Sequence, residues 1–143
     1  MWITAVVTGI ALGWVGCRFI RNDELNQAAV AGNSKRTTEL LSKGANVNGR
    51  GMHAMTPIMS AARGGHLKVV ELLVAKGADV NSHNDSGSAL MWAVDSGSEE
   101  LVSYLLRSGV DAQWTNALGS SALDFAREQK KTNIVRLLEA RRK

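Results

Sequence analysis

The residues whose side chains could do chemistry are few and lie far apart. Among 143 residues there are three histidines, at positions 53, 66 and 83, and a single cysteine, Cys17. Metal sites and catalytic groups need several such residues at a fixed short spacing, as in His-Glu-x-x-His. The sequence contains no such motif, no glycine-rich phosphate loop and no Gly-x-Ser-x-Gly nucleophile turn. We therefore expect no enzymatic activity, no cofactor and no metal site.

Composition and charge fit an ordered globular domain, with 45% hydrophobic and 21% charged residues. The formal net charge of +4 is unevenly placed, since residues 18–50 and 116–143 are net basic and residues 51–115 are net acidic. The basic carboxyl terminus predicts either a solvated capping helix or contact with anionic lipid headgroups, an acidic protein or RNA. Because its basic residues are not interleaved with aromatic ones, we expect no nucleic-acid partner.

The amino-terminal segment is unusually apolar. Residues 1–17 carry no charge, and the apolar character continues past Arg18 through Phe19 and Ile20. Twenty residues of helix reach roughly 30 Å, the thickness of the hydrocarbon core of a bilayer. We therefore predict a transmembrane anchor helix over residues 1–21. Basic residues follow this run but do not precede it, which places the rest of the chain in the cytoplasm by the positive-inside rule.

Three other interpretations of this segment remain. A cleaved signal peptide normally starts with basic residues, which are missing here. A lipoprotein signal would end at Cys17, but Trp14 stands where such signals have leucine. In that case the chain would be exported, acylated at Cys17, and act as a periplasmic binding or protective factor. The last interpretation is a helix buried in a soluble core.

Small residues recur every fourth position within the apolar segment. They are Ala5, Gly9, Gly13 and Cys17, which share one face of a helix and include a Gly-x-x-x-Gly motif. Such a stripe lets helix backbones approach closely in lipid. It predicts packing against another membrane helix, from a second copy or from another protein.

Internal repetition dominates the remainder of the chain. The segment 44–48 (Gly-Ala-Asn-Val-Asn) returns 33 residues later as Gly-Ala-Asp-Val-Asn at 77–81, and in weaker form at 109–113. Leucine pairs precede these glycines, at 40–41, 72–73 and 105–106, and another pair lies at 137–138. A period of about 33 residues indicates stacked units that bury their apolar faces against one another.

The segment from Thr56 to Leu73 resembles the ankyrin repeat along its whole length. The resemblance implies an all-α solenoid of about four helix pairs with short hairpin loops, in a domain spanning residues 22–143. The approximate repeats are 22–50, 51–83, 84–116 and 117–143. The sequence departs from the family at Met59, Met91 and Asp124, where a histidine often ties neighbouring repeats together.

The resemblance also implies a protein-binding module. In this family, hairpin tips and the exposed face of the first helix of each pair form the recognition surface. Carried onto this sequence, that surface comprises Arg50, Met52, His53, Met55, Arg63, His83, Asp85, Asp95, Trp114, Thr115, Leu118 and Arg127. Trp114 is the residue that we expect to act as a binding anchor, since interface hot spots are rich in tryptophan.

These expectations combine into one functional hypothesis. The chain is expected to be a single-pass membrane protein, and its repeats serve as an accessory or scaffolding subunit of a membrane protein complex. Its partner is then an integral membrane protein. The alternatives are the lipoprotein described above and an anionic-lipid or RNA-binding protein that uses the basic carboxyl terminus.

Overall fold

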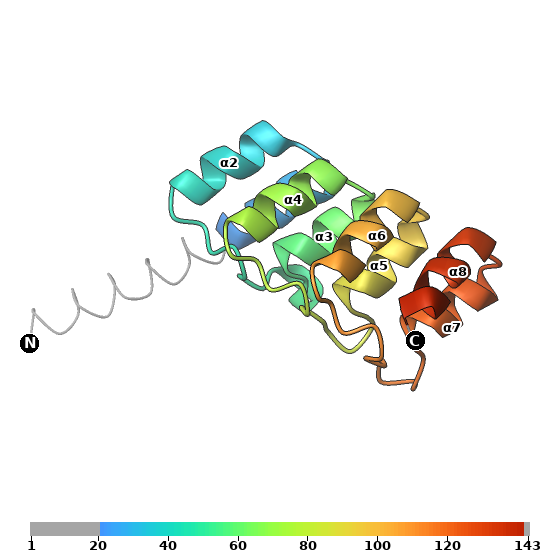
Figure 1. Ribbon diagram of the computed structural model, residues 1–143. Helices are drawn as coiled ribbons and strands as arrows, with labels where there is room; N and C mark the ends of the chain where they lie inside the picture. Colours follow the sequence, from blue (N-terminus) through green and yellow to red (C-terminus); the bar gives the residue numbers. More distant parts are fainter. Residues whose placement is uncertain (1–20, 142–143) are drawn as a thin grey trace, which may run out of the picture.

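The computed structural model describes residues 21–141 (Figure 1). Residues 21–30 are helical and precede α2 (Ser34–Ser42). The following elements are a 3-10 helix η1 (Met52–Ala54), α3 (Pro57–Gly64), α4 (Leu67–Ala75), α5 (Ala89–Ser96), α6 (Glu99–Arg107), α7 (Ala122–Glu128) and α8 (Thr132–Arg141). The described chain is thus all-α, and each of the four expected repeats contains one helix pair.

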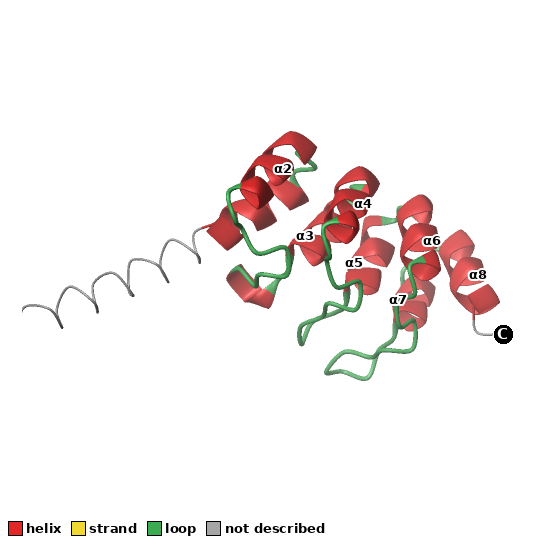
Figure 2. Cartoon of the chain, turned by 60° about the vertical axis from the view of Figure 1, so that its left-hand side comes forward, coloured by secondary structure: helices red, strands yellow, loops and turns green. Residues whose placement is uncertain are grey.

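The helices form two layers. α3, α5 and α7 lie side by side in one layer, and α2, α4, α6 and α8 succeed one another in the second (Figure 1). The long loops between successive helix pairs project together from one side of the stack (Figure 2). This arrangement is the expected solenoid of stacked helix pairs.

The predicted anchor over residues 1–21 and its packing stripe, Ala5, Gly9, Gly13 and Cys17, lie outside the described residues, except for Arg21 at its end. Within residues 21–141, no helix combines the length and apolarity needed to cross a membrane.

Serine side chains start several helices. Ser88, Ser98 and Ser121 occupy N-cap positions of α5, α6 and α7, and each hydroxyl accepts a hydrogen bond from a backbone N–H in the first turn. Thr56 precedes α3. It stands at the N-cap position with extended backbone, but its hydroxyl makes no capping bond. Pro57 occupies the first helical position, where the missing N–H would have had no partner within the helix.

The core is built from alanine, leucine, valine and methionine. Ala61, Ala62 and Ala93 are fully buried, and their small side chains let adjacent inner helices pack closely. Met59 and Met91 are 0% and 2% exposed and belong to the same continuous core. The methionines therefore fill the positions where the family often has histidine with apolar packing rather than hydrogen bonds.

Asparagine side chains link one hairpin to the next. The Asn48 side-chain oxygen accepts from the backbone N–H of Asp79 at 2.8 Å, and its amide donates to the carbonyl of Gly77 at 3.1 Å. One repeat later, the Asn81 side-chain oxygen accepts from the N–H of Asp111 at 2.7 Å. These bonds satisfy loop N–H groups and fix the spacing between repeats.

Polar groups cover both ends of the stack. At the first end, Arg36 pairs with Glu24 at 3.1 Å and with Glu39 at 3.0 Å, and Lys43 also pairs with Glu39. At the last end, Arg127 pairs with Glu139 at 2.7 Å. Three of these residues have a counterpart 33 positions away in an interior repeat, and each counterpart is apolar and buried. They are Val69 for Arg36, Val94 for Arg127 and Leu106 for Glu139. The outer repeats therefore act as polar caps of the stack.

Candidate functional site

The exposed surface on the loop side of the stack is the candidate site. We call it the hairpin face and define it by the loops 48–55, 81–88 and 113–121 with the exposed positions of α3, α5, α7 and helix 21–30. Helix caps and the asparagine bonds hold the loops, so the exposed side chains project from a fixed frame. A fixed frame lowers the entropy lost when a partner binds.

The first hairpin differs from the other two. Isolated antiparallel bridges join His83 to Ser88 and Thr115 to Ser121, which closes the second and third loops. The first loop contains the 3-10 helix η1 in place of such a bridge. His53 and Ala54 in this helix both adopt left-handed backbone, with φ of 56° and 53°. Such conformations are costly for residues other than glycine and cluster at functional sites.

Contacts with helix 21–30 hold this loop in place. The Asp23 carboxylate accepts from the N–H of Met52 at 2.9 Å, and the Asn26 amide donates to the carbonyl of Met55 at 3.1 Å. The Met52 side chain is left 62% exposed, whereas that of Met55 is only 8% exposed and packs into the core. Met55, which the sequence placed on the binding surface, turns its side chain inward and contributes to the lining of the hollow described next.

A hollow of about 160 Å³ lies between this loop and the inner helices of the first two repeats. Its lining comprises Asp23, Asn26, Gln27, Val30, Met52, His53, Met55, Ser60 and Arg63. Gln27 and Val30 are not among the binding residues predicted from the sequence. The 33-residue period reveals them, because they occupy the positions of Ser60 and Arg63 one repeat earlier.

Arg63 bridges the second and third repeats on the hairpin face. Its guanidinium carbon lies 5.4 Å from the centre of the Trp92 ring, within range of a cation–π contact. Trp92 is half-buried and packs against the core, so its ring mainly supports the Arg63 guanidinium and offers little surface to a partner.

Trp114 and His83 stack across neighbouring hairpins. Their ring centres are 4.8 Å apart with the planes tilted by 37°, and the Nδ1 atom of His83 lies 2.9 Å from the carbonyl oxygen of Asn81. Trp114 is half-buried and also touches the core. The structure therefore gives Trp114 a role in joining hairpins while part of its ring stays exposed.

The third hairpin presents the most exposed apolar side chain in the described chain. Leu118 is 88% exposed, beside the exposed Thr115. The Asn116 side chain orders this tip by accepting from the N–H groups of Leu118 and Ser120, both at 3.0 Å. The neighbouring tip contributes the exposed Asp85, whose carbonyl accepts from the N–H of Ala117 at 3.3 Å.

Three remaining charged residues have different surroundings. Arg50 is exposed and donates to the carbonyls of Ala54 and His83, which ties the first loop to the second. Asp95 is exposed and accepts from Gln129 at 2.9 Å, on the same face of the inner layer. Arg127 is an exposed residue of α7 and pairs with Glu139 of α8 at the last end of the stack.

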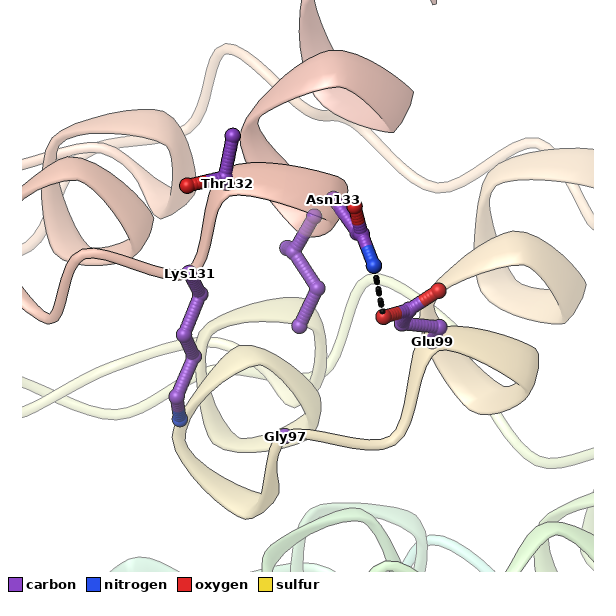
Figure 3. Close-up of a pocket in the computed structure, with 6 residues that line it drawn as sticks. Gly97, Glu99, Lys131, Thr132 and Asn133 are labelled. Atoms are coloured by element: carbon purple, nitrogen blue, oxygen red, sulfur yellow. Dashed lines mark hydrogen bonds between the residues drawn. The ribbon is translucent and has the colours of Figure 1, made fainter.

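A second hollow lies between the third and fourth repeats, away from the hairpins (Figure 3). Asn133 donates to Glu99 at 2.8 Å there, and the Lys131 ammonium donates to the carbonyls of Val94 and Asp95 at 2.6 and 2.7 Å. Lys131 thereby satisfies carbonyls at the end of α5. His66 holds the corresponding position in the second repeat, with Nε2 3.0 Å from the carbonyl oxygen of Val30. This hollow is thus a polar joint between repeats.

The part of the chain that the structure describes contains no group of three histidine, cysteine, aspartate or glutamate residues placed to hold a metal ion. The chemistry that the hairpin face offers is therefore apolar contact, hydrogen bonding and charge pairing.

Comparison with known proteins agrees with this geometry. The family model for ankyrin repeats matches residues 25–113 and 82–141. Similar proteins include the transient receptor potential cation channel subfamily A member 1 homolog of Caenorhabditis elegans, 32% identical over 115 residues. The ankyrin repeat and KH domain-containing protein mask of Drosophila melanogaster is 36% identical over 106 residues. The probable E3 ubiquitin-protein ligase XBOS34 of Oryza sativa subsp. japonica is 32% identical over 131 residues.

The similarity is confined to part of each relative. These three matches cover 80%, 72% and 89% of this chain but only 10%, 3% and 26% of the channel, the KH-domain protein and the ligase. Their names describe unlike proteins, so what they share with this chain is the repeat stack and its capacity for protein interaction. On the family match and the stacked helix pairs, the chain belongs to the ankyrin-repeat family.

Proposed function

We propose that the chain is a membrane-anchored accessory or scaffolding subunit, whose ankyrin repeats hold a protein partner on their hairpin face. The observation that carries the binding role is the joint exposure of Met52, Arg63 and Leu118 on loops and helices held by internal hydrogen bonds. Binding without catalytic turnover is part of the proposal, since this face offers contact groups and no catalytic constellation.

The anchor is proposed on the sequence alone. The uncharged run over residues 1–17 supports attachment to a membrane, and the basic residues at 18, 21, 35 and 36 support a cytoplasmic location of the repeats. An integral membrane protein is then the natural partner, since both would meet at the same bilayer. The similarity to repeats of a protein named as a cation channel is consistent with such a location.

Affinity purification in mild detergent tests both parts of the proposal. The full chain is compared with a chain lacking residues 2–21, and co-purified proteins are identified by mass spectrometry. We expect an integral membrane protein at fixed stoichiometry with the full chain and its loss, or marked depletion, with the truncated chain. A partner retained equally by both chains would limit the role of residues 2–21 to simple anchoring.

Mass spectrometry of the purified chain distinguishes the membrane anchor from the main alternative, the lipoprotein. A mass that includes residues 2–16, with or without Met1, supports an uncleaved anchor. Loss of residues 1–16 with acyl chains added to Cys17 would establish the lipoprotein instead and contradict a cytoplasmic location.

A further inference from the structure

We infer that the hollow between the first two repeats binds a short peptide segment that carries an apolar side chain next to a carboxylate. The inference rests on the proposed function, because it names the partner chemistry for one part of the hairpin face. It adds the subsite, the residues that select the ligand and the charge that the ligand carries.

The size and lining of the hollow define the apolar half of the ligand. Its volume is about 160 Å³ and it is open to solvent, so it can receive a side chain from a bound segment without enclosing it. Val30 and Met52 border it with side chains that are 42% and 62% exposed, although both are large and apolar. Covering these side chains removes apolar surface from water, which favours one medium-sized apolar residue as the occupant.

The left-handed residues keep this apolar rim open. His53 and Ala54 hold η1 in a form that the other hairpins do not adopt, and Met52 stands at its start. The Asp23 bond to the Met52 N–H fixes the backbone there at 2.9 Å. The strained backbone thus presents Met52 to the solvent.

The charges around the hollow define the polar half. Within residues 21–141, Arg63 forms no ion pair, and its guanidinium lies over the Trp92 ring. Arg50 stands at the same loop outside the lining of the hollow and, among the described residues, donates to the backbone carbonyls of Ala54 and His83. The carboxylate that lines the hollow, Asp23, is already bonded to the Met52 N–H. A carboxylate that enters the hollow therefore meets the Arg63 guanidinium, which has no carboxylate partner among residues 21–141, and arginine binds carboxylates through paired hydrogen bonds.

Selection from a phage-displayed library of random 12-residue peptides on the immobilised full chain tests this inference. We expect enriched peptides to carry leucine, isoleucine, methionine or phenylalanine within two positions of aspartate or glutamate. Synthetic versions should bind about tenfold more weakly to Arg63→Glu and to Met52→Ser than to the unaltered chain. The affinity should also fall as salt is raised, since the ion pair is partly exposed.

Arg107→Glu is the matched control, because Arg107 is an exposed arginine at the end of the outer helix α6. It should leave peptide affinity within twofold, and the melting temperature of each variant reports whether the stack stays folded. Repeating the selection on Arg63→Glu should return basic residues in place of acidic ones.

Four results would overturn the inference. Enriched peptides without acidic residues, or affinities insensitive to Arg63→Glu, would place the peptide elsewhere on the hairpin face. A chain that selects no peptide but still captures its membrane partner would reject the peptide subsite and leave the proposed function standing. A chain that captures neither would contradict both.

Discussion

At the scale of single residues, backbone conformation explains why particular residue types stand at particular positions, which composition does not reveal. The residue after the inner helix is a left-handed glycine in the first three repeats, with φ of 69°, 72° and 77° at Gly32, Gly65 and Gly97. Lys130 holds the same position in the fourth repeat with φ of 56°. A side chain in this conformation is strained, because its Cβ crowds the backbone.

Lys130→Gly is therefore expected to stabilise the chain by about 0.5–1 kcal/mol, since glycine relieves the strain at the end of the helix. Urea denaturation followed by circular dichroism measures the change. Lys76→Gly is the matched control, because Lys76 ends α4 with φ of −94°, where glycine only adds freedom to the unfolded chain. Stabilisation by both substitutions, or by neither, would remove backbone strain as the reason.

Asn81 is a second residue whose side chain has a specific structural role. Its side-chain oxygen bonds to the Asp111 N–H across repeats, so Asn81→Ala should cost about 1–2 kcal/mol of unfolding free energy. Gln113 holds the same position in the third hairpin, where its side chain bridges to no further hairpin within residues 21–141, and Gln113→Ala should change the unfolding free energy by less than about 0.5 kcal/mol. Equal losses in the two variants would show that the asparagine bond does not hold the hairpins together.

At the scale of elements, the sequence predicted the helix pairs well and the hairpins less well. The helix pairs follow from apolar periodicity, leucine pairs and glycine stops, which depend on local pattern. The inward turn of Met55 and the 3-10 helix of the first loop depend on contacts with helix 21–30, and these contacts arise only once the two elements are packed. The pairing of Arg127 with Glu139 on α8 likewise forms only once the two helices are packed.

The first hairpin yields a prediction at this scale. A Cβ atom at Gly51 would lie 2.3 Å from the Asn26 side-chain nitrogen and 2.5 Å from an Asp23 carboxylate oxygen, the groups that hold the loop. Gly51→Ala must displace them and break their bonds to Met52 and Met55, at a cost of about 1–3 kcal/mol.

Gly87→Ala provides the control within the second hairpin, because its added methyl group meets Met91 at an ordinary 3.5 Å. Thermal unfolding should show a clear loss for Gly51→Ala and little change for Gly87→Ala. No loss at Gly51 would mean that the first loop does not depend on the contact with helix 21–30.

At the scale of the whole molecule, polar ends and an exposed hairpin face divide the surface by role. The ion pairs of Arg36, Glu39 and Lys43 occupy the first end, and that of Arg127 with Glu139 occupies the last. Interior repeats bury valine and leucine at matching positions, so these ends are unsuited to stacking against a further apolar unit. A partner is then expected to bind along a side of the stack, and the hairpin face offers exposed apolar and charged groups there.

The first end also carries a pH signature. Hydrogen bonds and charge from Lys43 and Arg36 hold the pKa of the Glu39 carboxyl below its ordinary value of 4.5. Because the folded pKa is the lower one, the ion pairs stabilise the fold above pH 4.5 and lose that effect as pH falls through the folded pKa. Titration of Glu39 by NMR should show the lowered pKa, and Lys43→Ala should move it up toward 4.5. A Glu39 pKa at 4.5 in the unaltered chain would show that these ion pairs are not formed in solution.

The measurement that bears most directly on the account is site-specific photo-crosslinking in native membranes. A photoreactive phenylalanine analogue is placed singly at Met52 and Leu118 on the hairpin face, and at Lys68 and Arg107 on the outer helices, all of them exposed. The account predicts crosslinks to one partner protein from positions 52 and 118 and none from positions 68 and 107. Crosslinks to that partner from the outer helices, with none from the hairpin face, would contradict it.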